Sequence, residues 1–312
     1  MPSCARHECN AEVDVSFKAG FVAIIGRPNV GKSTLLNAIL GERLAIVTPK
    51  PQTTRHRIVG ILNEPDAQIV FLDTPGYHRS EKPLNQAMND IVDSVIDDAD
   101  VCCLMLEAPA KDLEMERSLF ERIGSERCIL VANKSDLVQR ADFEKIAVRF
   151  RDEWGARELV LLSALKNEGV QTLIHAIRAH LPEGEAFYPD DSYTSHPVRF
   201  IAAELIREQL FLQMQQEIPY SSAVEIEEFK DATESDPITR IRAAVVVEKE
   251  SQKAMVIGKG GRRIKEIGTR ARKAIEELVG GKVFLELQVK VEKDWTKDRD
   301  AIRRLGYSSQ LE

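Results

Sequence analysis

The sequence contains no apolar run long enough to cross a lipid bilayer. A membrane-spanning helix needs roughly 20 consecutive apolar residues, and no stretch of this chain approaches that length. The first 20 residues, MPSCARHECNAEVDVSFKAG, also lack the apolar segment of a secretory signal. We therefore expect a cytosolic protein.

Cysteine is sparse, with five among 312 residues. Cys102, Cys103 and Cys128 lie inside apolar runs, where a thiol behaves as a small hydrophobic side chain. Residues 4–9 hold two cysteines and one histidine, which are only three candidate metal ligands with no second pair downstream. We interpret this leader as disordered rather than metal-binding.

Charge is distributed unevenly along the chain. The net charge is -7, which by itself argues mildly against a nucleic-acid partner. Between Lys253 and Lys273, however, eight basic residues accompany a single acid, Glu266, a local balance of 8 - 1 = +7. Such a patch can bind a polyanion even when the whole chain is acidic.

The strongest local signal is GRPNVGKS at residues 26–33, which fits the phosphate-loop pattern G-x-x-x-x-G-K-[ST]. The five apolar residues before it predict a buried strand, and the residues from Thr34 predict a helix. Two glycines let the backbone curl so that its N–H groups converge on phosphate oxygens. Lys32 is placed to reach the β- and γ-phosphates, and Ser33 to bind Mg²⁺.

Two further segments fit the γ-phosphate side of such a site. Residues 44–57 form a polar loop with two prolines, and we expect either Thr53 or Thr54 to reach the metal. Residues 67–73 predict a buried strand that ends in DTPG, residues 73–76. An acid at the carboxyl end of such a strand supports Mg²⁺, and the amide of Gly76 can approach the γ-phosphate.

The pattern N-K-x-D at residues 133–136 favours guanine over adenine. A carboxylate such as Asp136 accepts both the N1–H and the N2–H of guanine, whereas adenine presents an acceptor at N1. A buried polar group left unpaired by the wrong base costs on the order of several kcal/mol. We expect Asn133 to tie this loop to the phosphate loop, the Lys134 stem to cross the base, and the backbone of residues 163–165 to meet guanine O6. Further buried strands are expected at residues 100–107, 127–132 and 158–162, and a helix at 169–181.

The chain divides where its composition changes. Residues 182–197 are rich in proline, glycine and acids and show no periodicity. A chain of this length usually forms about two domains. Together with the change in composition, this predicts four parts: a leader at 1–17, a nucleotide-binding domain at 18–185, a linker at 186–197 and a second domain at 198–312. In the second domain, patterns predict helices at 198–217, 262–279 and 294–307 and strands at 223–229, 241–247 and 283–291, with the acidic stretch 225–236 as a solvated edge.

The decisive feature of the second domain is MVIGKGGRRI, residues 255–264. A G-x-x-G turn between helices lets an RNA backbone approach closely, with amides and Lys259 on the phosphates and splayed bases in the apolar groove beside it. The element order α-β-β-α-α-β resembles a type II KH domain. The candidate RNA contacts are Ile257, Gly258, Lys259, Gly260, Gly261, Arg262, Arg263 and Lys265.

The motifs GRPNVGKS, QTTRH, DTPG, NKSD and SAL, followed by this KH-like half, resemble the Era family of bacterial ribosome-assembly GTPases over nearly all of residues 18–307. The resemblance implies an α/β P-loop GTPase domain, with a mixed sheet of about six strands and helices on both faces, and then a smaller α+β type II KH domain. It also implies GTP/GDP and Mg²⁺ as cofactors, slow hydrolysis of GTP, and binding to the 3′ end of 16S rRNA in the assembling 30S ribosomal subunit. A monomeric cytoplasmic protein is expected, and the resemblance allows peripheral association with the inner face of the cell membrane.

The residues expected to contact the nucleotide come from all five motifs. They are Gly26, Arg27, Pro28, Asn29, Val30, Gly31, Lys32, Ser33, Thr34, Asp73, Thr74, Pro75, Gly76, Asn133, Lys134, Asp136, Ser163, Ala164 and Leu165. The expected Mg²⁺ residues are Ser33, Thr53 or Thr54, and Asp73, and the expected catalytic residues are Lys32, Thr54 and Gly76.

Three positions distinguish this sequence from its wider relatives. Tyr77 stands where Ras-like proteins carry the glutamine that orients the attacking water, so intrinsic turnover should be slow. Asn29 occupies the position that binds a K⁺ ion in similar GTPases, which makes K⁺ a candidate cofactor. Leu165 stands where the family often has Lys or Glu, and we expect little effect because that contact comes from the backbone.

Two other functions remain open on the sequence. The chain could be an RNA-binding scaffold whose nucleotide site is occupied but scarcely turned over. Alternatively, the GTPase could be joined to a module that binds a protein. At the C-terminus we expect Trp295 and Leu305 to pack rather than to stack on bases.

Overall fold

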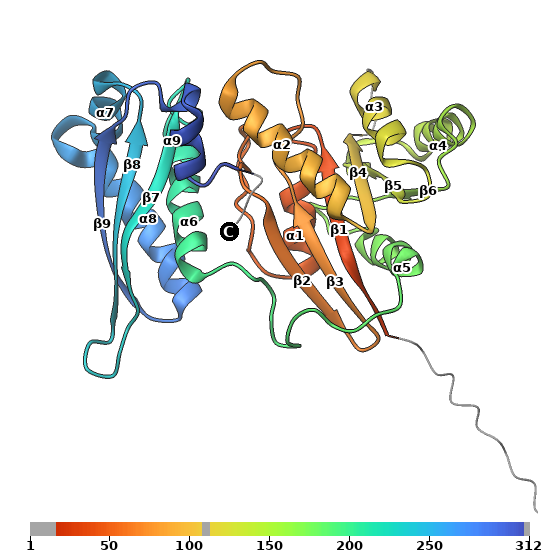
Figure 1. The fold of residues 1–312 in the computed structure, drawn as a ribbon, viewed down its shortest axis with the longest axis horizontal. Coiled ribbons are helices and arrows are strands. Elements are labelled where there is room, and N and C mark those ends of the chain that lie inside the picture. Colours follow the sequence, from red (N-terminus) through yellow and green to blue (C-terminus); the bar gives the residue numbers. More distant parts are fainter. Residues whose placement is uncertain (1–16, 108–112, 309–312) are drawn as a thin grey trace, which may run out of the picture.

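The structure is a computed structural model that describes residues 17–107 and 113–308. The leader segment 4–9 with its cysteines and histidine lies outside these residues. Two sheets, each with its own helices, stand side by side (Figure 1). None of the described helices is long and apolar enough to cross a membrane.

The first sheet has six strands in the order β2-β3-β1-β4-β5-β6, with β2 antiparallel to β3 and every other pair parallel. This confirms the expected mixed sheet. Its elements are β1 (Lys18–Gly26), α1 (Lys32–Leu40), β2 (Ile58–Glu64), β3 (Ala67–Asp73), α2 (Pro83–Asp98), β4 (Val101–Glu107), α3 (Glu114–Ile123), β5 (Cys128–Asn133), α4 (Arg140–Trp154), β6 (Glu158–Leu161) and α5 (Val170–His180).

Helices cover both faces of this sheet, as expected. Side chains of α1 and α5 pack with one face, and side chains of α2, α3 and α4 pack with the other. Successive strand residues point to opposite faces, so Cys103 belongs to the first cluster and Cys102 to the second, with Cys128. All three thiols are buried and free, which confirms that they act as small hydrophobic side chains.

The second sheet has three strands in the order β7-β8-β9. The elements follow the predicted α-β-β-α-α-β order, with a short C-terminal helix added: α6 (Val198–Gln213), β7 (Ser222–Lys230), β8 (Ile238–Val247), α7 (Glu250–Ile257), α8 (Arg262–Val279), β9 (Lys282–Val291) and α9 (Arg299–Arg304). The strands β7 and β8 are antiparallel, whereas β8 and β9 are parallel.

Two predictions for this half need correction. The first helix ends at Gln213 and not at residue 217, because Met214 is extended and its side chain turns into a buried cluster with Leu210 and Ile218. The C-terminal helix is reduced to α9, preceded by a 3₁₀ turn at Trp295–Lys297. The acidic stretch 225–236 lies at a sheet edge with half-buried and exposed side chains, as expected, and there Glu227 pairs with Arg242 of β8 and Lys290 of β9.

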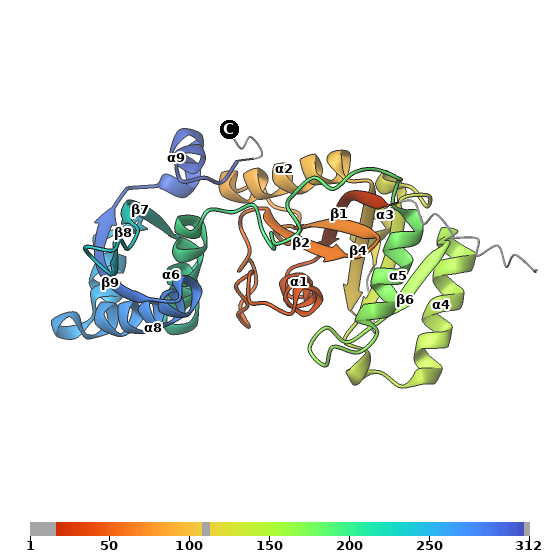
Figure 2. The same cartoon turned by 90° about the horizontal axis from the view of Figure 1, so that it is seen from below.

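The C-terminal residues Trp295 and Leu305 are buried, which confirms their packing role. They share a cluster with Tyr307 and with Leu84 of α2. This cluster therefore joins the two halves of the molecule on the side where α2 and α9 meet (Figure 2).

The segment between α5 and α6 is attached to the free edge of β2. The amide of Ile61 donates to the carbonyl of Tyr193 at 2.9 Å, and the Thr194 hydroxyl donates to the carbonyl of Val59 at 2.6 Å. The amide of Val59 donates to Nε2 of His196 at 2.9 Å. An edge strand that would otherwise be open is thus covered, and the linker is fixed in place.

His196 should make stability depend on pH. Burial lowers the pKa of His196 to about 4, and its Nε2 has to stay unprotonated to accept the Val59 amide. Because the folded pKa lies below the unfolded value, the unfolded chain binds more protons between pH 6.5 and 4, and stability is lost as the pH falls through that window. We expect His196→Gln, whose amide oxygen can accept the same bond, to reduce this loss by about 1–2 kcal/mol in urea unfolding at pH 7 and pH 5. The exposed His175→Gln serves as control, and equal losses in His196→Gln and wild type would contradict the interpretation.

Candidate functional site

The phosphate loop connects the end of β1 to the first turn of α1. Gly31 has a φ of 104°, a conformation that side-chain-bearing residues rarely adopt, and a Cβ there would collide with the side-chain amide of Asn133. The loop therefore needs glycine at this point. It leaves the N-terminal turn of α1 facing a cavity of about 360 Å³.

Lys32 is buried beside this loop. Its Nζ donates to the carbonyl oxygens of Gly26 and Arg27, both at 3.0 Å. Burial lowers the pKa of the Lys32 amine to about 8, and the charge of Asp73 offsets part of that effect. An ammonium held by carbonyls alone is poorly compensated, so an anion in the cavity would stabilise it.

Ser33, Thr54 and Asp73 meet at the base of the cavity. Ser33 Oγ lies 2.7 Å from Thr54 Oγ1 and donates to Asp73 Oδ2 at 2.6 Å. Ligand oxygens on adjacent corners of a Mg²⁺ octahedron are about 2.9 Å apart, close to the separation of the two hydroxyls. Asp73 is buried, its Oδ1 has no hydrogen-bond partner among the described residues, and burial raises its pKa to about 6. These three oxygen-bearing side chains fit a hard cation.

Thr53 faces away from this cluster. Its hydroxyl donates to the carbonyl of Lys50 at 2.8 Å and lies 2.6 Å from the hydroxyl of Thr48. The Thr53 hydroxyl is used within its own loop, whereas the Thr54 hydroxyl meets Ser33. The geometry favours Thr54.

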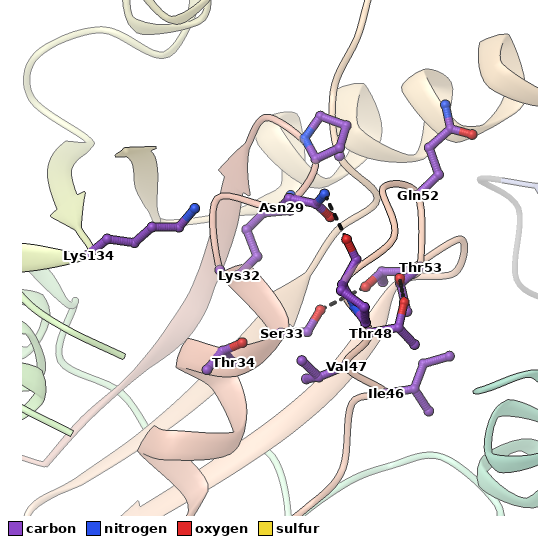
Figure 3. Close-up of a pocket in the computed structure, with 15 residues that line it drawn as sticks. Asn29, Lys32, Ser33, Thr34, Ile46, Val47, Thr48, Gln52, Thr53 and Lys134 are labelled. Atoms are coloured by element: carbon purple, nitrogen blue, oxygen red, sulfur yellow. Dashed lines mark hydrogen bonds between the residues drawn. The ribbon is translucent and has the colours of Figure 1, made fainter. Parts of the chain in front are cut away.

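The cavity is lined by residues from both sides of the expected γ-phosphate position. In Figure 3, Asn29, Lys32 and Ser33 lie across from the loop that carries Thr48 and Thr53. Asn29 Nδ2 reaches the carbonyl of Pro49 at 3.4 Å and closes part of this gap. Gly76 also lines the cavity, and a Cβ on it would lie 2.6 Å from atoms of Pro28, so the DTPG motif touches the phosphate loop directly.

Some predicted contact residues use their side chains elsewhere. Arg27 pairs with buried Glu116 of α3 at 2.5 and 2.9 Å. Val30 packs in the core, and the Thr74 hydroxyl donates to the carbonyl of Ile24 at 2.8 Å. Thr34 remains at the cavity, while Pro75 is buried. Arg27, Val30 and Thr74 therefore shape the loop with their side chains and have only their backbone available to a ligand, whereas Thr34 still lines the cavity.

The loops at the ends of β5 and β6 are joined by buried Asn133. Its side-chain nitrogen donates to the carbonyl of Val30 at 2.7 Å, and its oxygen accepts from the amide of Ala164 at 3.0 Å. Ser163 Oγ donates to exposed Asp136 at 2.7 Å and so orients that carboxylate. The predicted base-recognition residues are therefore held together with the phosphate loop.

Two further residues flank this end of the cavity, where a flat ligand would lie. Lys134 pairs with Glu107 at 2.8 Å, and its side chain points across the cavity wall (Figure 3). The side chain of Leu165 is 77% exposed. Only the backbone at residue 165 is thus fixed, as expected for a contact that does not depend on the side chain.

A second candidate site surrounds the G-x-x-G turn. A groove of about 410 Å³ is lined by Gln213, Gly258, Lys259, Arg262, Arg263 and Glu266. Gly260 has a φ of 60°, and a Cβ on it would meet no atom within 4 Å, so the turn is open to solvent. Lys259, Arg262 and Lys265 are exposed and form no ion pair with any other described residue. The structure thus places an open, cationic turn where the sequence predicted one, with Ile257 packed behind it.

The sequence analysis missed the residues that hold the loop at 44–57, here called the switch segment. Lys50 Nζ donates to the carbonyls of Phe211 and Met214. Arg207 donates to the carbonyl of Thr53 and also pairs with Glu204. The one available signal was the set of charged residues 204, 207 and 208 at helical spacing in an otherwise apolar stretch.

Arg55 is a second missed contact from the switch segment. Its guanidinium is buried and donates to the carbonyls of Pro219 at 2.7 Å and Ser222 at 2.9 Å. It also lies 5.3 Å from the ring centre of Phe211. No pattern in the sequence around Arg55 predicts that this arginine is buried.

Comparisons with known proteins agree with both halves of this description. Residues 21–134 match a family described as 50S ribosome-binding GTPase, and residues 217–296 match the KH domain family. The chain is 46% identical over 298 residues to GTPase Era of Geobacter metallireducens, covering 95% of this chain and 99% of that protein. It is 47% identical to GTPase Era of Syntrophus aciditrophicus, covering 94% and 96% of the two chains.

Two solved structures are similar over nearly the whole chain. A crystal structure of Era in complex with MgGDPNP and nucleotides 1506–1542 of 16S ribosomal RNA has a TM-score of 0.88 and 38% identity, covering 94% of this chain and 99% of that one. A variant of Aquifex aeolicus Era bound to GDP·AlF4⁻ has a TM-score of 0.88 and 37% identity, covering 94% and 100%.

Proposed function

Because this chain belongs to the Era family of GTPases, we propose that it is a GTP-hydrolysing switch whose second domain binds the 3′ end of 16S rRNA during assembly of the 30S subunit. The proposal rests on one observation. The chain carries both a cavity at the phosphate loop, where Ser33 and Thr54 lie together as a cation would need them, and an open, positively charged groove at the G-x-x-G turn. We assign the GTPase domain to residues 18–185, the linker to 186–197 and the KH domain to 198–312.

The cavity residues have separate roles in hydrolysis. Lys32 and the loop amides would stabilise charge on the β–γ bridge and on the γ-oxygens. Ser33 and Thr54 would hold Mg²⁺ with Asp73 behind them, and the metal would supply neutralising charge to the β- and γ-phosphates. The amide of Gly76 would register the γ-phosphate, while Asp136, oriented by Ser163, would select guanine.

Turnover by the protein alone should be slow. Tyr77 packs against the sheet cluster that contains α2, and its amide donates to the carbonyl of Gly26 at 3.1 Å. A tyrosine lacks the side-chain amide with which a glutamine at this position orients the attacking water. The structure therefore assigns no side chain at this position to the attacking water.

The two adjacent threonines provide a matched test of the metal site. We expect Thr54→Ala to lower GTP turnover by about tenfold or more, because a ligand that stabilises the transferring phosphoryl charge is lost. Thr53→Ala should change turnover by less than about threefold, since that hydroxyl bonds only within the loop. Phosphate release from GTP, with ATP as the control nucleotide, measures both.

The same assay separates the main alternative, an RNA-binding scaffold with an occupied but idle nucleotide site. If the wild-type protein releases no phosphate from GTP, either alone or with ribosomal subunits, the scaffold alternative is supported. Release from ATP as fast as from GTP would contradict the role given to Asp136. A larger defect in Thr53→Ala than in Thr54→Ala would overturn the metal assignment.

A potassium ion at Asn29 is part of the proposal. Asn29 has a φ of 63° and lies against the switch segment at Pro49, so an ion held there would add positive charge beside the β–γ bridge. We expect turnover to be about fivefold or more higher in KCl than in NaCl at equal ionic strength. Asn29→Gly, which keeps the positive φ without strain, should lose the difference, and equal wild-type rates in the two salts would exclude the ion.

The G-x-x-G groove should bind unpaired RNA through phosphates. Gly260→Asp places a carboxylate in the open turn, and we expect at least about a tenfold loss of affinity for a short single-stranded RNA. Gly260→Asn is the matched control, because asparagine has the same shape, tolerates positive φ and is neutral. Filter binding at two salt concentrations measures the effect, and GTP turnover should not change.

The salt dependence also decides whether this half binds a protein instead. Affinity for RNA must fall with salt as counterions return to the phosphates. Binding that is unaffected by salt and by Gly260→Asp would favour a protein partner.

We further propose that the protein is a cytoplasmic monomer that can associate peripherally with the inner face of the cell membrane. Family membership and the charged surface support this. Sedimentation of the purified protein alone and with anionic lipid vesicles tests both parts.

A further inference from the structure

One side chain of the switch segment points away from the nucleotide cavity and into the second domain. Pro49 and Gln52 line the cavity, whereas Lys50 does not. Its Nζ donates to the carbonyl oxygens of Phe211 and Met214. Both figures of the fold show the connection between α1 and β2, which includes this segment, facing α6 across the junction (Figures 1 and 2).

These two carbonyls lie at the C-terminal end of α6, which ends at Gln213. The last carbonyls of an α-helix have no partner within the helix, and a cation near them is favoured by the helix dipole. No basic residue of α6 itself occupies its last turn. Lys50 thus supplies from the first domain a cap that α6 lacks.

The capped turn also forms a wall of the G-x-x-G groove. Gln213 lies between the two carbonyls that Lys50 holds, and it lines the groove together with Gly258 and Arg262. The adjacent Met214 packs in one cluster with Val256 of α7 and with residues of α8. Displacement of this turn would therefore change the shape of the groove.

The same short stretch carries Thr54. In this structure Thr54 contacts Ser33 while Lys50 contacts the end of α6. Between them, the carbonyl of Thr53 accepts from Arg207 of α6, and Arg55 donates to Pro219 and Ser222. These contacts fall within the six residues 50–55, so we expect a displacement of Thr54 from the metal position to shift Lys50 as well.

We propose that Lys50 is the positioning residue that couples the nucleotide site to the RNA groove. This inference rests on the proposed function and specifies its regulation. With GTP and Mg²⁺ bound, Thr54 is seated, Lys50 caps α6, and Gln213 completes the groove. Loss of the γ-phosphate releases the switch segment, withdraws the cap and loosens the last turn of α6. RNA is then bound less tightly.

Coupling of this kind has to be reciprocal. If GTP raises the affinity for RNA by some factor, RNA raises the affinity for GTP relative to GDP by the same factor. Such factors are typically about 5–150-fold. Lys50→Met keeps the length of the side chain but removes the donor, so it interrupts the last step and leaves Arg207 and Arg55 in place.

The test compares RNA affinity in two nucleotide states. A fluorescent single-stranded RNA corresponding to nucleotides 1506–1542 of 16S rRNA is titrated with full-length protein loaded with MgGDPNP or MgGDP. We expect wild type to bind about fivefold or more tightly with GDPNP. In Lys50→Met this ratio should fall to within about twofold of one, because affinity in the GDPNP state drops while affinity in the GDP state stays.

Controls separate coupling from charge and from folding. Lys230→Met removes the same charge at the far end of β7, eight residues from Ser222 along the strand, and should keep the wild-type ratio. Gln213→Ala, which alters the groove wall directly, should also lower the ratio of RNA affinities in the two nucleotide states. Thermal melting and GDP affinity of Lys50→Met must match wild type; if they do not, Gln213→Ala decides the question by the same ratio.

Each outcome has one meaning. An unchanged ratio in Lys50→Met and Gln213→Ala overturns the inference. A wild type that binds RNA equally in both nucleotide states overturns it as well, while the proposed function stands. A wild type that binds no RNA in either state, or hydrolyses no GTP, instead overturns the proposed function.

Discussion

The switch segment has to satisfy two sets of contacts at once, and most of the molecule's behaviour depends on this constraint. On one side Thr54 meets Ser33 above Asp73. On the other side, within four residues, Lys50 and the carbonyl of Thr53 are held by α6. Because each residue adds at most about 3.3–3.6 Å of reach, a displacement of either set of contacts by more than a few residues' length has to move the other set as well. The two domains are therefore linked through the loop that encloses the nucleotide as well as through the linker.

Unfavourable burial of charge makes this loop responsive to a ligand. Lys32 and Asp73 are both buried, and burial favours the neutral form of each side chain. It lowers the pKa of Lys32 and raises the pKa of Asp73. The remaining oxygen of Asp73 lacks a partner among the described residues. A phosphate beside Lys32 and a cation beside Asp73 would remove both penalties together. The cluster is thus more stable with its ligands than without them, which is the condition for a ligand to select one arrangement of the loop.

The sequence predicted the elements whose signals are local. The glycine-bearing loop at 26–33, the DTPG turn and the buried strands each carry their own pattern within ten residues, and the strand at 67–73 was placed with its observed bounds. The order of the motifs was enough to identify the nucleotide side. The sequence could not decide between Thr53 and Thr54. The choice depends on how contacts with α6 orient this segment, so that the Thr54 hydroxyl faces Ser33.

Contacts between distant residues were beyond the sequence for the same reason. Arg55 and Arg207 look like ordinary surface charges in the sequence, yet both are buried between the domains. The early end of α6 follows from the packing of Met214 and Ile218 with strands and helices more than 25 residues away. The attachment of the linker to β2 was equally unforeseen, because its residues bond through backbone atoms, one threonine hydroxyl and one histidine ring, none of which forms a pattern in the sequence. This attachment leaves the residues after His196 as the place where a change in domain position must be absorbed.

The switch segment leads directly into the same strand, β2, so both connections between the domains start from one edge of the first sheet. In the coupling we propose, a shift at the nucleotide would therefore reach α6 through contacts that the structure holds in place.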